Sequence, residues 1–168
     1  MTVLRLGVLT VSDGVVAGTR KDASGDMIVA WAESRQYEVC GRRAVADEVA
    51  DIVSVLAGWS DSGEYDVILS TGGTGLAERD VTPEATVQVI EREAPGIAEV
   101  IRAAGYANTV YSVLSRGVAG VRGRTLIVNL PGGPSGVRDG LLVLSEVVDH
   151  AAALLRGAPS GHTPVSSA

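Results

Sequence analysis

The fold of this chain is decided by Asp66–Ser70, which reads DVILS, and by the five residues that follow, Thr71–Gly75, which read TGGTG. The first segment is a short apolar run that ends directly at a glycine cluster, and this pattern predicts a strand buried on both faces. Such strands belong to parallel sheets, because helices cover both faces of those sheets. The second segment therefore predicts a loop at the carboxyl end of a central strand.

Other segments of the chain share the strand pattern. Leu4–Val11 and Thr125–Leu130 are continuous apolar runs, and each stops at a cluster of turn-forming residues. Tyr37–Val45 carries charge near one end, which predicts a strand nearer the sheet edge, and Val118–Val121 predicts a short strand. The sequence thus indicates one sheet built mainly from buried strands.

Helical spacing of apolar residues alternates with these strands. It predicts helices over residues 25–35, 48–56, 82–93, 95–104 and 135–155. Ser24, Asp47 and Thr82 are the candidate N-caps of the first three helices. Strands that alternate with helices predict an α/β fold around a central, mostly parallel sheet.

Length and composition limit the architecture. The chain has 168 residues, 46% of them hydrophobic, which fits a single α/β domain over residues 1–156. Residues 157–168 are rich in Ser, Pro, Gly and Thr, so we expect a flexible C-terminal tail there. No apolar stretch approaches the ~20 residues needed to cross a bilayer, and no signal-peptide pattern is present, so the expected location is cytoplasmic.

Charge and cysteine content exclude several classes of protein. The formal net charge of −6 disfavours binding to nucleic acid, which usually requires a basic surface. Cys40 is the single cysteine, so neither an intrachain disulfide nor a cysteine-based zinc site can form. Its position inside a predicted strand favours a small core residue over a nucleophile.

Polar loops follow three of the predicted buried strands. Ser12 and Asp13 follow the first, Thr71–Gly75 follows the third, and Asn129 lies at the end of the fourth, with Pro131 and Gly132 just beyond it. The carboxyl ends of parallel strands meet at one sheet edge, where open α/β sheets bind their ligands. The sequence therefore predicts a binding site formed by all three loops.

The glycine loop contributes Gly72, Gly73, Thr74 and Gly75 to this edge. Accessible backbone N–H groups and a hydroxyl suit a phosphate or another oxyanion, although a glycine-rich turn without a ligand has the same pattern. The loop is not a P-loop, because no Gly-Lys-Ser/Thr follows and the one lysine of the chain is Lys21.

Two aspartates flank the loop region. Asp80 lies five residues after the loop, and Asp47 follows the second predicted strand. Carboxylates beside a phosphate site are explained if a hard cation such as Mg²⁺ lies between the two charges. The alternatives are structural: Asp47 is the favoured N-cap of its helix, and Asp80 could stabilise the turn before Thr82. Asp13 could likewise form an Asx turn.

General bases are scarce near this edge. The histidines are His150, in the last predicted helix, and His162, in the tail, so neither reaches the loops easily. A reaction at this edge should therefore need little proton abstraction. Attack by an ionised phosphate oxygen on another phosphate meets that condition and relies on positioning and charge neutralisation. Arg116 could bind an anion there, although most exposed arginines are only solvated.

Taken in order, the motifs of the chain resemble those of the MogA/MoaB family of molybdenum cofactor biosynthesis. They cover nearly all of residues 4–155 and consist of Thr10-Val11-Ser12-Asp13, Gly18, Asp22, Ser24-Gly25, Asp47-Glu48, Thr71–Gly75, Arg79–Ala85, Ser115-Arg116 and Asn129–Gly132. The resemblance implies a three-layer α/β/α fold and a homotrimer. It further implies a nucleotidyltransferase that moves AMP from ATP to the terminal phosphate of molybdopterin, releases pyrophosphate and requires Mg²⁺.

Positions carry over from the family motifs residue by residue. Asp47 and Asp80 match the family's essential aspartates, so the resemblance implies that they are catalytic and hold Mg²⁺. The substrate and nucleotide cleft would be lined by Ser12, Asp13, Gly72, Gly73, Thr74, Gly75, Ser115, Asn129, Pro131 and Gly132. A molybdate-inserting enzyme is a candidate partner.

The chain departs from the family pattern at one place. Family members often carry a lysine soon after the Pro-Gly turn, where this chain has Ser135 and Gly136, and Arg138 is the nearest cation. The same fold also occurs in non-catalytic molybdopterin-binding or scaffold proteins, so this class stays open as the alternative to an adenylyltransferase.

Overall fold

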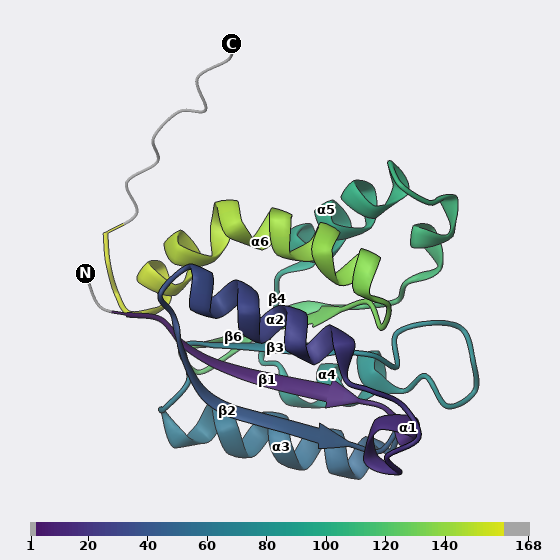
Figure 1. The fold of residues 1–168 in the computed structure, drawn as a ribbon. Helices are drawn as coiled ribbons and strands as arrows, with labels where there is room; N and C mark the ends of the chain where they lie inside the picture. The colour runs from purple at the N-terminus through teal and green to yellow at the C-terminus, as the bar shows by residue number, and fades with distance from the viewer. Residues whose placement is uncertain (1–2, 160–168) are drawn as a thin grey trace.

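Residues 3–159 are described in the computed structural model, where six strands form one sheet in the order β2-β1-β3-β6-β5-β4 (Figure 1). The strands are β1 (Arg5–Val11), β2 (Glu38–Val45), β3 (Val67–Thr71), β4 (Arg92–Glu93), β5 (Ala119–Arg122) and β6 (Thr125–Leu130). The first four in this order are parallel, whereas β5 and β4 add antiparallel pairs at one edge. The predicted mostly parallel sheet is confirmed, with β2 at its other edge.

Helices cover both faces of the sheet (Figure 1). One face carries α2 (Ala23–Ser34), α5 (Pro95–Tyr106) and α6 (Pro134–Leu155), and the other carries α3 (Val49–Ser62) and α4 (Thr82–Val89). A one-turn helix α1 (Asp13–Val16) follows β1, and a 3₁₀ helix η1 (Val110–Leu114) follows α5. The three-layer α/β/α architecture is therefore confirmed.

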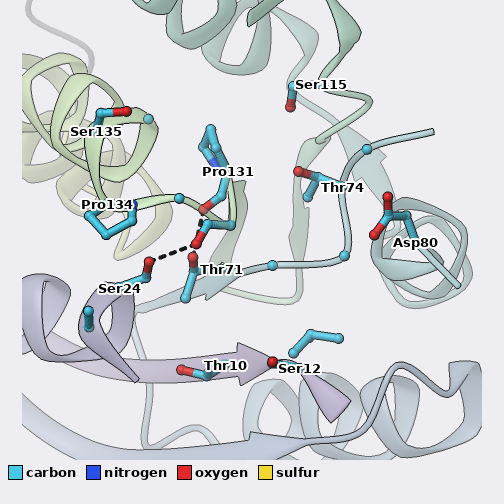
Figure 2. Close-up of a pocket in the computed structure, with 18 of the residues that line it drawn as sticks. Thr10, Ser12, Ser24, Thr71, Thr74, Asp80, Ser115, Pro131, Pro134 and Ser135 are labelled. Atoms are coloured by element: carbon cyan, nitrogen blue, oxygen red, sulfur yellow. Dashed lines mark hydrogen bonds between the residues drawn. The ribbon is translucent and has the colours of Figure 1, made fainter. Parts of the chain in front are cut away.

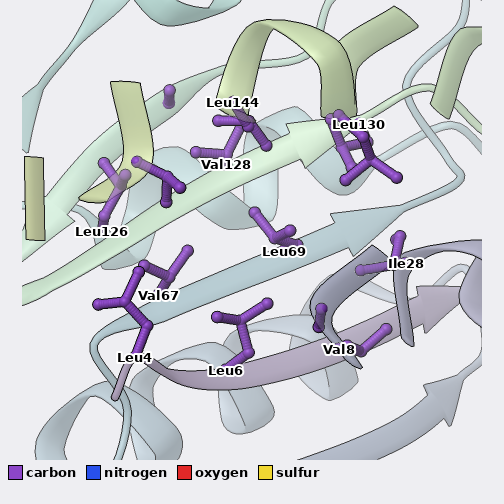
Figure 3. Packing of buried hydrophobic residues seen from close by; sticks show 14 of the residues in the cluster. Leu4, Leu6, Val8, Ile28, Val67, Leu69, Leu126, Val128, Leu130 and Leu144 are labelled. Carbon is purple, nitrogen blue, oxygen red and sulfur yellow. The ribbon is translucent and has the colours of Figure 1, made fainter. Parts of the chain in front are cut away.

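The central strands supply side chains to two separate cores. On β1, Leu6 and Val8 pack against α2 and α6 (Figure 3). Leu9 packs against α3 and α4 on the opposite face. On β6, Leu126 and Ile127 divide between the faces in the same way. Each fully buried aliphatic side chain contributes about 1.5–3 kcal/mol to folding. Burial on both faces explains why these strands are uninterrupted apolar runs.

None of the three predicted N-caps, Ser24, Asp47 and Thr82, holds the cap position of its helix. Asp47 does not cap α3, because Glu48 holds the cap position and makes no side-chain bond there. Ser24 lies inside α2, and the cap is Asp22, whose carboxylate accepts a hydrogen bond from Gly25 N at 3.0 Å. Both aspartates and Ser24 are good caps by residue type, so only tertiary contacts distinguish their roles.

The helix predicted over residues 82–93 ends four residues early. Ile90 has extended backbone angles, and Arg92–Glu93 pairs with β5 as the edge strand β4. Thr82 is not an N-cap: it is the first residue of α4, and its hydroxyl donates to Gly72 O at 2.8 Å. The start of α4 is thus bonded directly to the glycine loop.

Cys40 is exposed, so the prediction of a core residue was wrong. It lies on the edge strand β2, where burial is incomplete because the helices leave much of the strand uncovered. Partial burial and nearby acidic groups raise the pKa of its thiol, which keeps it protonated at neutral pH. The expectation that it is not a nucleophile is consistent with that direction.

The predicted C-terminal tail and the predicted absence of a membrane span can be compared with the described residues. Most of the tail predicted to be flexible, residues 160–168, lies outside the described residues. Within residues 3–159, none of the helices combines the length and apolar composition that a bilayer crossing requires.

Candidate functional site

A cleft of about 780 Å³ opens at the carboxyl edge of the parallel strands. Its floor lies where the loops after β1 and β3 leave the sheet, and the chain order of the strands reverses between these two neighbours. Such reversal points are where open α/β sheets bind ligands. The loop after β6, the start of α6 and the η1 segment complete the walls (Figure 2).

Two positions of the glycine loop after β3 can be occupied only by glycine. Gly72 and Gly73 have left-handed backbone angles, φ 97° and 64°. A Cβ on Gly72 would lie 2.2 Å from Val11 O, and one on Gly73 would lie 2.4 Å from the Thr82 hydroxyl. The loop therefore packs tightly between the end of β1 and the start of α4.

The N–H groups of Gly73, Thr74 and Gly75 donate no hydrogen bond within the described part of the chain. Carbonyl oxygens of this loop are bonded instead: Gly73 O accepts from Thr82 N at 3.0 Å. A run of free backbone donors lining a cleft is suited to a phosphate.

Asp47 and Asp13 are joined by reciprocal hydrogen bonds. Asp13 N donates to Asp47 Oδ2 at 2.9 Å, and Asp47 N donates to Asp13 Oδ1 at 3.0 Å. Burial, with the charges of Asp13 and Asp80 nearby, raises the pKa of Asp47. Burial and the two neighbouring acids thus disfavour the ionised form of Asp47 more than the Asp13 N–H bond and Arg79 favour it.

Arg79 ties this pair to the loop that follows β3. Its guanidinium donates to Asp13 Oδ2 at 2.6 Å and Oδ1 at 3.0 Å, and to Glu48 Oε1 at 3.0 Å. These bonds hold the pKa of Asp13 below its usual value. Arg79 thereby connects the loops after β1, β2 and β3. Because Arg79 directly precedes Asp80 in the chain, these bonds also anchor the segment that carries Asp80. Asp13 does not line the cleft itself, and its carboxylate is bonded to Arg79 and to Asp47 N.

Asp80 faces the glycine loop from the other end of the same segment. Its Oδ2 accepts from Ala77 N at 3.0 Å, and a Cβ on Gly75 would lie 2.7 Å from that oxygen. Arg116 braces the segment by donating to Gly75 O at 2.7 Å and Asp80 O at 2.6 Å, and it pairs with Glu84. Arg116 is thus occupied in holding the loop and is not a free anion ligand.

Asp47 and Asp80 form a donor set that fits a hard divalent cation. Each keeps its Oδ1 without a hydrogen bond to another described residue, and both line the cleft beside the glycine loop. Mg²⁺ commonly binds one or two carboxylates together with substrate phosphates and water. No larger group of metal-binding side chains occurs among residues 3–159.

The turn after β6 is fastened to the neighbouring strands. Ser24 Oγ donates to Gly132 O at 2.7 Å, and Thr71 Oγ1 donates to Pro131 O at 2.6 Å (Figure 2). Pro131 and Gly132 line the cleft, as do Ser12 and Ser115. Ser12 also caps α1 by accepting from Val15 N at 3.3 Å.

Asn129 lies beneath the cleft rather than on its lining. Its side chain is buried, donates to Ser70 Oγ at 2.8 Å and Thr86 Oγ1 at 3.0 Å, and accepts from Val118 N at 3.1 Å. Asn129 therefore holds β6, β3 and α4 together at the sheet edge. Arg138 also lies away from the cleft lining, in a separate groove with Trp31 and Leu142.

Sequence reasoning missed several residues of the site, including the cations Arg20 and Lys21, which line the cleft. Arg79 was quoted as part of a motif without a role, and Asp139 on α6 was not noticed, although it lines the cleft. The position of Arg79 directly before Asp80 was the feature of the sequence that could have indicated a role for Arg79. For Asp139 the sequence offered none, since an acid on a helix is usually exposed.

These features define an α/β protein with a glycine loop of free backbone donors and a pair of acidic side chains at the switch point of its sheet. The chain belongs to the MogA/MoaB family: residues 7–150 match the family model described as "Probable molybdopterin binding domain". The family predicted from the motifs is thereby confirmed.

Several relatives match most of the chain. A molybdopterin adenylyltransferase of Helicobacter pylori is 34% identical over 164 residues, covering 94% of this chain and 90% of its own length. That of Escherichia coli is 36% identical and covers 84% and 73%. The crystal structure of the molybdopterin biosynthesis enzyme MoaB from Thermus thermophilus is 47% identical, with a TM-score of 0.87 and coverage of 93% and 98%.

Larger relatives contain this unit as one part. The molybdenum cofactor synthesis protein cinnamon of Drosophila melanogaster is 40% identical over 92% of this chain, which spans only 26% of that protein. For a molybdenum cofactor biosynthesis bifunctional protein of Synechococcus elongatus, the chain spans 48% of the relative's length.

Proposed function

We propose that this protein is a molybdopterin adenylyltransferase, which transfers AMP from ATP to the terminal phosphate of molybdopterin and releases pyrophosphate. The observation that carries the proposal is the placement of Asp47 and Asp80 on either side of the free N–H groups of the glycine loop. Relatives matched over most of their length carry the same activity in their names.

The reaction needs no general base from the protein. An ionised phosphate oxygen of molybdopterin attacks the α-phosphorus of ATP, a new P–O bond forms, and the bond to pyrophosphate breaks with its electron pair on the leaving oxygen. His150 lies on an exposed part of α6, and no histidine lines the cleft among the described residues. The N–H groups of Gly73, Thr74 and Gly75 are placed to stabilise the charge on the phosphate oxygens.

Asp47 and Asp80 are the residues that would hold Mg²⁺, through their unbonded Oδ1 atoms. When bound, the ion would neutralise phosphate charge, together with Arg20 and Lys21, the two cations that line the cleft among the described residues. The protein's own contribution is to keep the two carboxylates apart and facing the glycine loop. The Asp13–Asp47 bonds and the Arg116 brace provide that rigidity.

Pyrophosphate release tests the proposal. Incubation with ATP, Mg²⁺ and molybdopterin should yield adenylylated molybdopterin and one equivalent of pyrophosphate, measured by a coupled phosphate assay and mass spectrometry. Tight pterin binding without pyrophosphate release would instead favour the rival class, a non-catalytic molybdopterin-binding or scaffold protein. Omitting molybdopterin controls for simple ATP hydrolysis.

Replacing Arg79 by glutamine should lower kcat/KM for this reaction by roughly tenfold, because Asp80 loses the neighbour that anchors its loop. The midpoint of thermal unfolding should barely move, since exposed ion pairs add little to stability. Steady-state kinetics and a melting curve check both parts. Arg122→Gln breaks a comparable surface pair with Asp61, remote from the cleft, and serves as control. Equal kinetics for the two variants would contradict the positioning role.

The family resemblance supports further proposals about the protein's setting. We expect a homotrimer, and the exposed apolar side chains of Val110, Tyr111 and Val113 supply surface for subunit contacts. The expected location is the cytoplasm, where a molybdate-inserting enzyme would be the partner that receives the product.

A further inference from the structure

The part of the cleft lining that comes from α5, α6 and η1 carries a buried carboxylate that the phosphate chemistry does not use. Asp139 lies in the second turn of α6 and is only 8% exposed. It lines the cleft together with Ile101 and Gly105 of α5 and Leu114 of η1. Asp47 and Asp80 lie at the glycine loop, so Asp139 belongs to a different wall of the same cleft.

One oxygen of this carboxylate is free to accept from a ligand. Oδ1 accepts from Asn108 Nδ2 at 2.8 Å, whereas Oδ2 has no hydrogen-bond partner and Asp139 has no ion pair among residues 3–159. No fully buried side-chain oxygen or nitrogen in this part of the chain lacks a partner, so Oδ2 must be accessible from the cleft. Gly105 of α5 is a near neighbour of this oxygen, since a Cβ there would lie 3.9 Å from it.

A nearly buried carboxylate without a cation is costly unless donors reach it, and the cleft is the side from which a ligand can supply them to Oδ2 in place of water. A carboxylate offers about four acceptor sites, so Oδ1 can accept a second bond beside that from Asn108. Two adjacent N–H donors on one planar group match the two oxygens, as a guanidinium does. The apolar side chains of Ile101 and Leu114 suit the faces of a flat ring.

We propose that Asp139 recognises the ring edge of the pterin substrate, by accepting from the ring N–H and the 2-amino group of its 2-amino-4-oxopyrimidine. This inference rests on the proposed function and adds the residue that selects the ring. An adenine edge places its amino group beside a ring nitrogen that is an acceptor, and the lone pair of that nitrogen would face the carboxylate. Asp139 therefore disfavours the nucleotide base and assigns this wall to the pterin.

A pair of stable probes tests this assignment on the full-length protein. The first is a 6-alkylpterin phosphate, and the second is the corresponding lumazine phosphate, where a carbonyl oxygen replaces the 2-amino group. Fluorescence titration near neutral pH should show the pterin binding about 10- to 100-fold more tightly than the lumazine. The variant Asp139→Asn presents an amide donor in place of Oδ2, so the order of the two affinities should reverse.

Controls separate this inference from the proposed function. Asp149→Asn alters an exposed acid on the same helix and should leave both affinities unchanged. Calorimetric binding of Mg·ATP should be the same in Asp139→Asn as in the unaltered protein, which also reports that the variant is folded. Equal binding of the two probes by the unaltered protein would overturn the role of Asp139 and leave the adenylyltransferase proposal standing.

Two other outcomes are decisive. No binding of the pterin phosphate to the unaltered protein would overturn the proposed function and this inference together. Guanosine monophosphate carries the same ring edge as the pterin, so it is the third probe. If it bound more tightly than the pterin phosphate and lost affinity in Asp139→Asn, the wall would be a guanine site and the pterin assignment would fail.

Discussion

Replacing Asp80 by alanine is expected to reduce adenylyl transfer by about a thousandfold while the protein stays folded. The carboxylate faces the glycine loop, and its removal takes away one of the two acidic groups that would hold Mg²⁺ against the phosphates. The side chain makes one hydrogen bond, with Ala77 N, and the loop backbone remains braced by Arg116. The measurement is the rate of pyrophosphate release at saturating ATP, with a thermal melt on the same sample.

Glu78→Ala is the matched control, because Glu78 is an exposed acid two residues earlier in the same loop. It removes the same charge from the same segment without touching the cleft lining. A rate close to normal in Asp80→Ala would refute the assigned role. Equal losses in the two variants would point to the net charge of the loop rather than to the Asp80 carboxylate.

The parts of the fold that could be predicted are those where one physical cause dominates the sequence pattern. β1, β3 and β6 are buried on both faces, so their residues had to be apolar without interruption and were recognisable. Each is followed by a polar loop, and parallel pairing brings those loops together whatever the details of packing. β2 is also parallel to β1, so Asp47, which follows β2, and Asp80, which follows β3, could be placed at the same edge for that reason.

The features that could not be predicted, such as helix caps and the burial of single side chains, depend on which of several chemically suitable neighbours is close in space. Asp22 and Asp47 are equally good caps by type, yet Asp22 caps α2 while Asp47 bonds to Asp13. In the sequence Asp139 resembles any exposed acid on a helix, and only its packing beside α5 and η1 makes it part of the cleft lining. Cys40 was misplaced because an apolar strand pattern does not reveal how far helices extend over an edge strand.

The glycine loop lies at the carboxyl end of strand β3, and an ion-pair network lies at its amino end. Asp66, just before β3, is 5% exposed. Its carboxylate accepts from Arg5 at 2.9 Å and 3.1 Å and from Arg156 at 2.5 Å and 3.1 Å. The network ties the start of β1 to the end of α6, on the side of the sheet away from the cleft.

Burial alone would raise the pKa of Asp66, but the hydrogen bonds from Arg156 and Arg5 outweigh it and lower the pKa from 3.8 to about 2. A carboxyl group with a depressed folded pKa stabilises the protein fully above its unfolded pKa. The stabilisation is lost as the pH falls from about 4 towards about 2. Nearly two pKa units correspond to about 2.5 kcal/mol.

Asp66→Ala is therefore expected to lower the free energy of unfolding by about 3 kcal/mol at neutral pH, since it also leaves the two arginines without their shared partner. The loss should shrink as the pH approaches about 2, because the unaltered protein then gives up the same interaction. Urea unfolding at a series of pH values measures both trends, and Asp61→Ala, which breaks an exposed pair, should show little of either. Turnover below the melting temperature should be retained, because this network and the cleft lie at opposite ends of the same strand. A pH-independent difference between Asp66→Ala and the unaltered protein would show that lost packing, rather than the ionised carboxylate, accounts for the destabilisation.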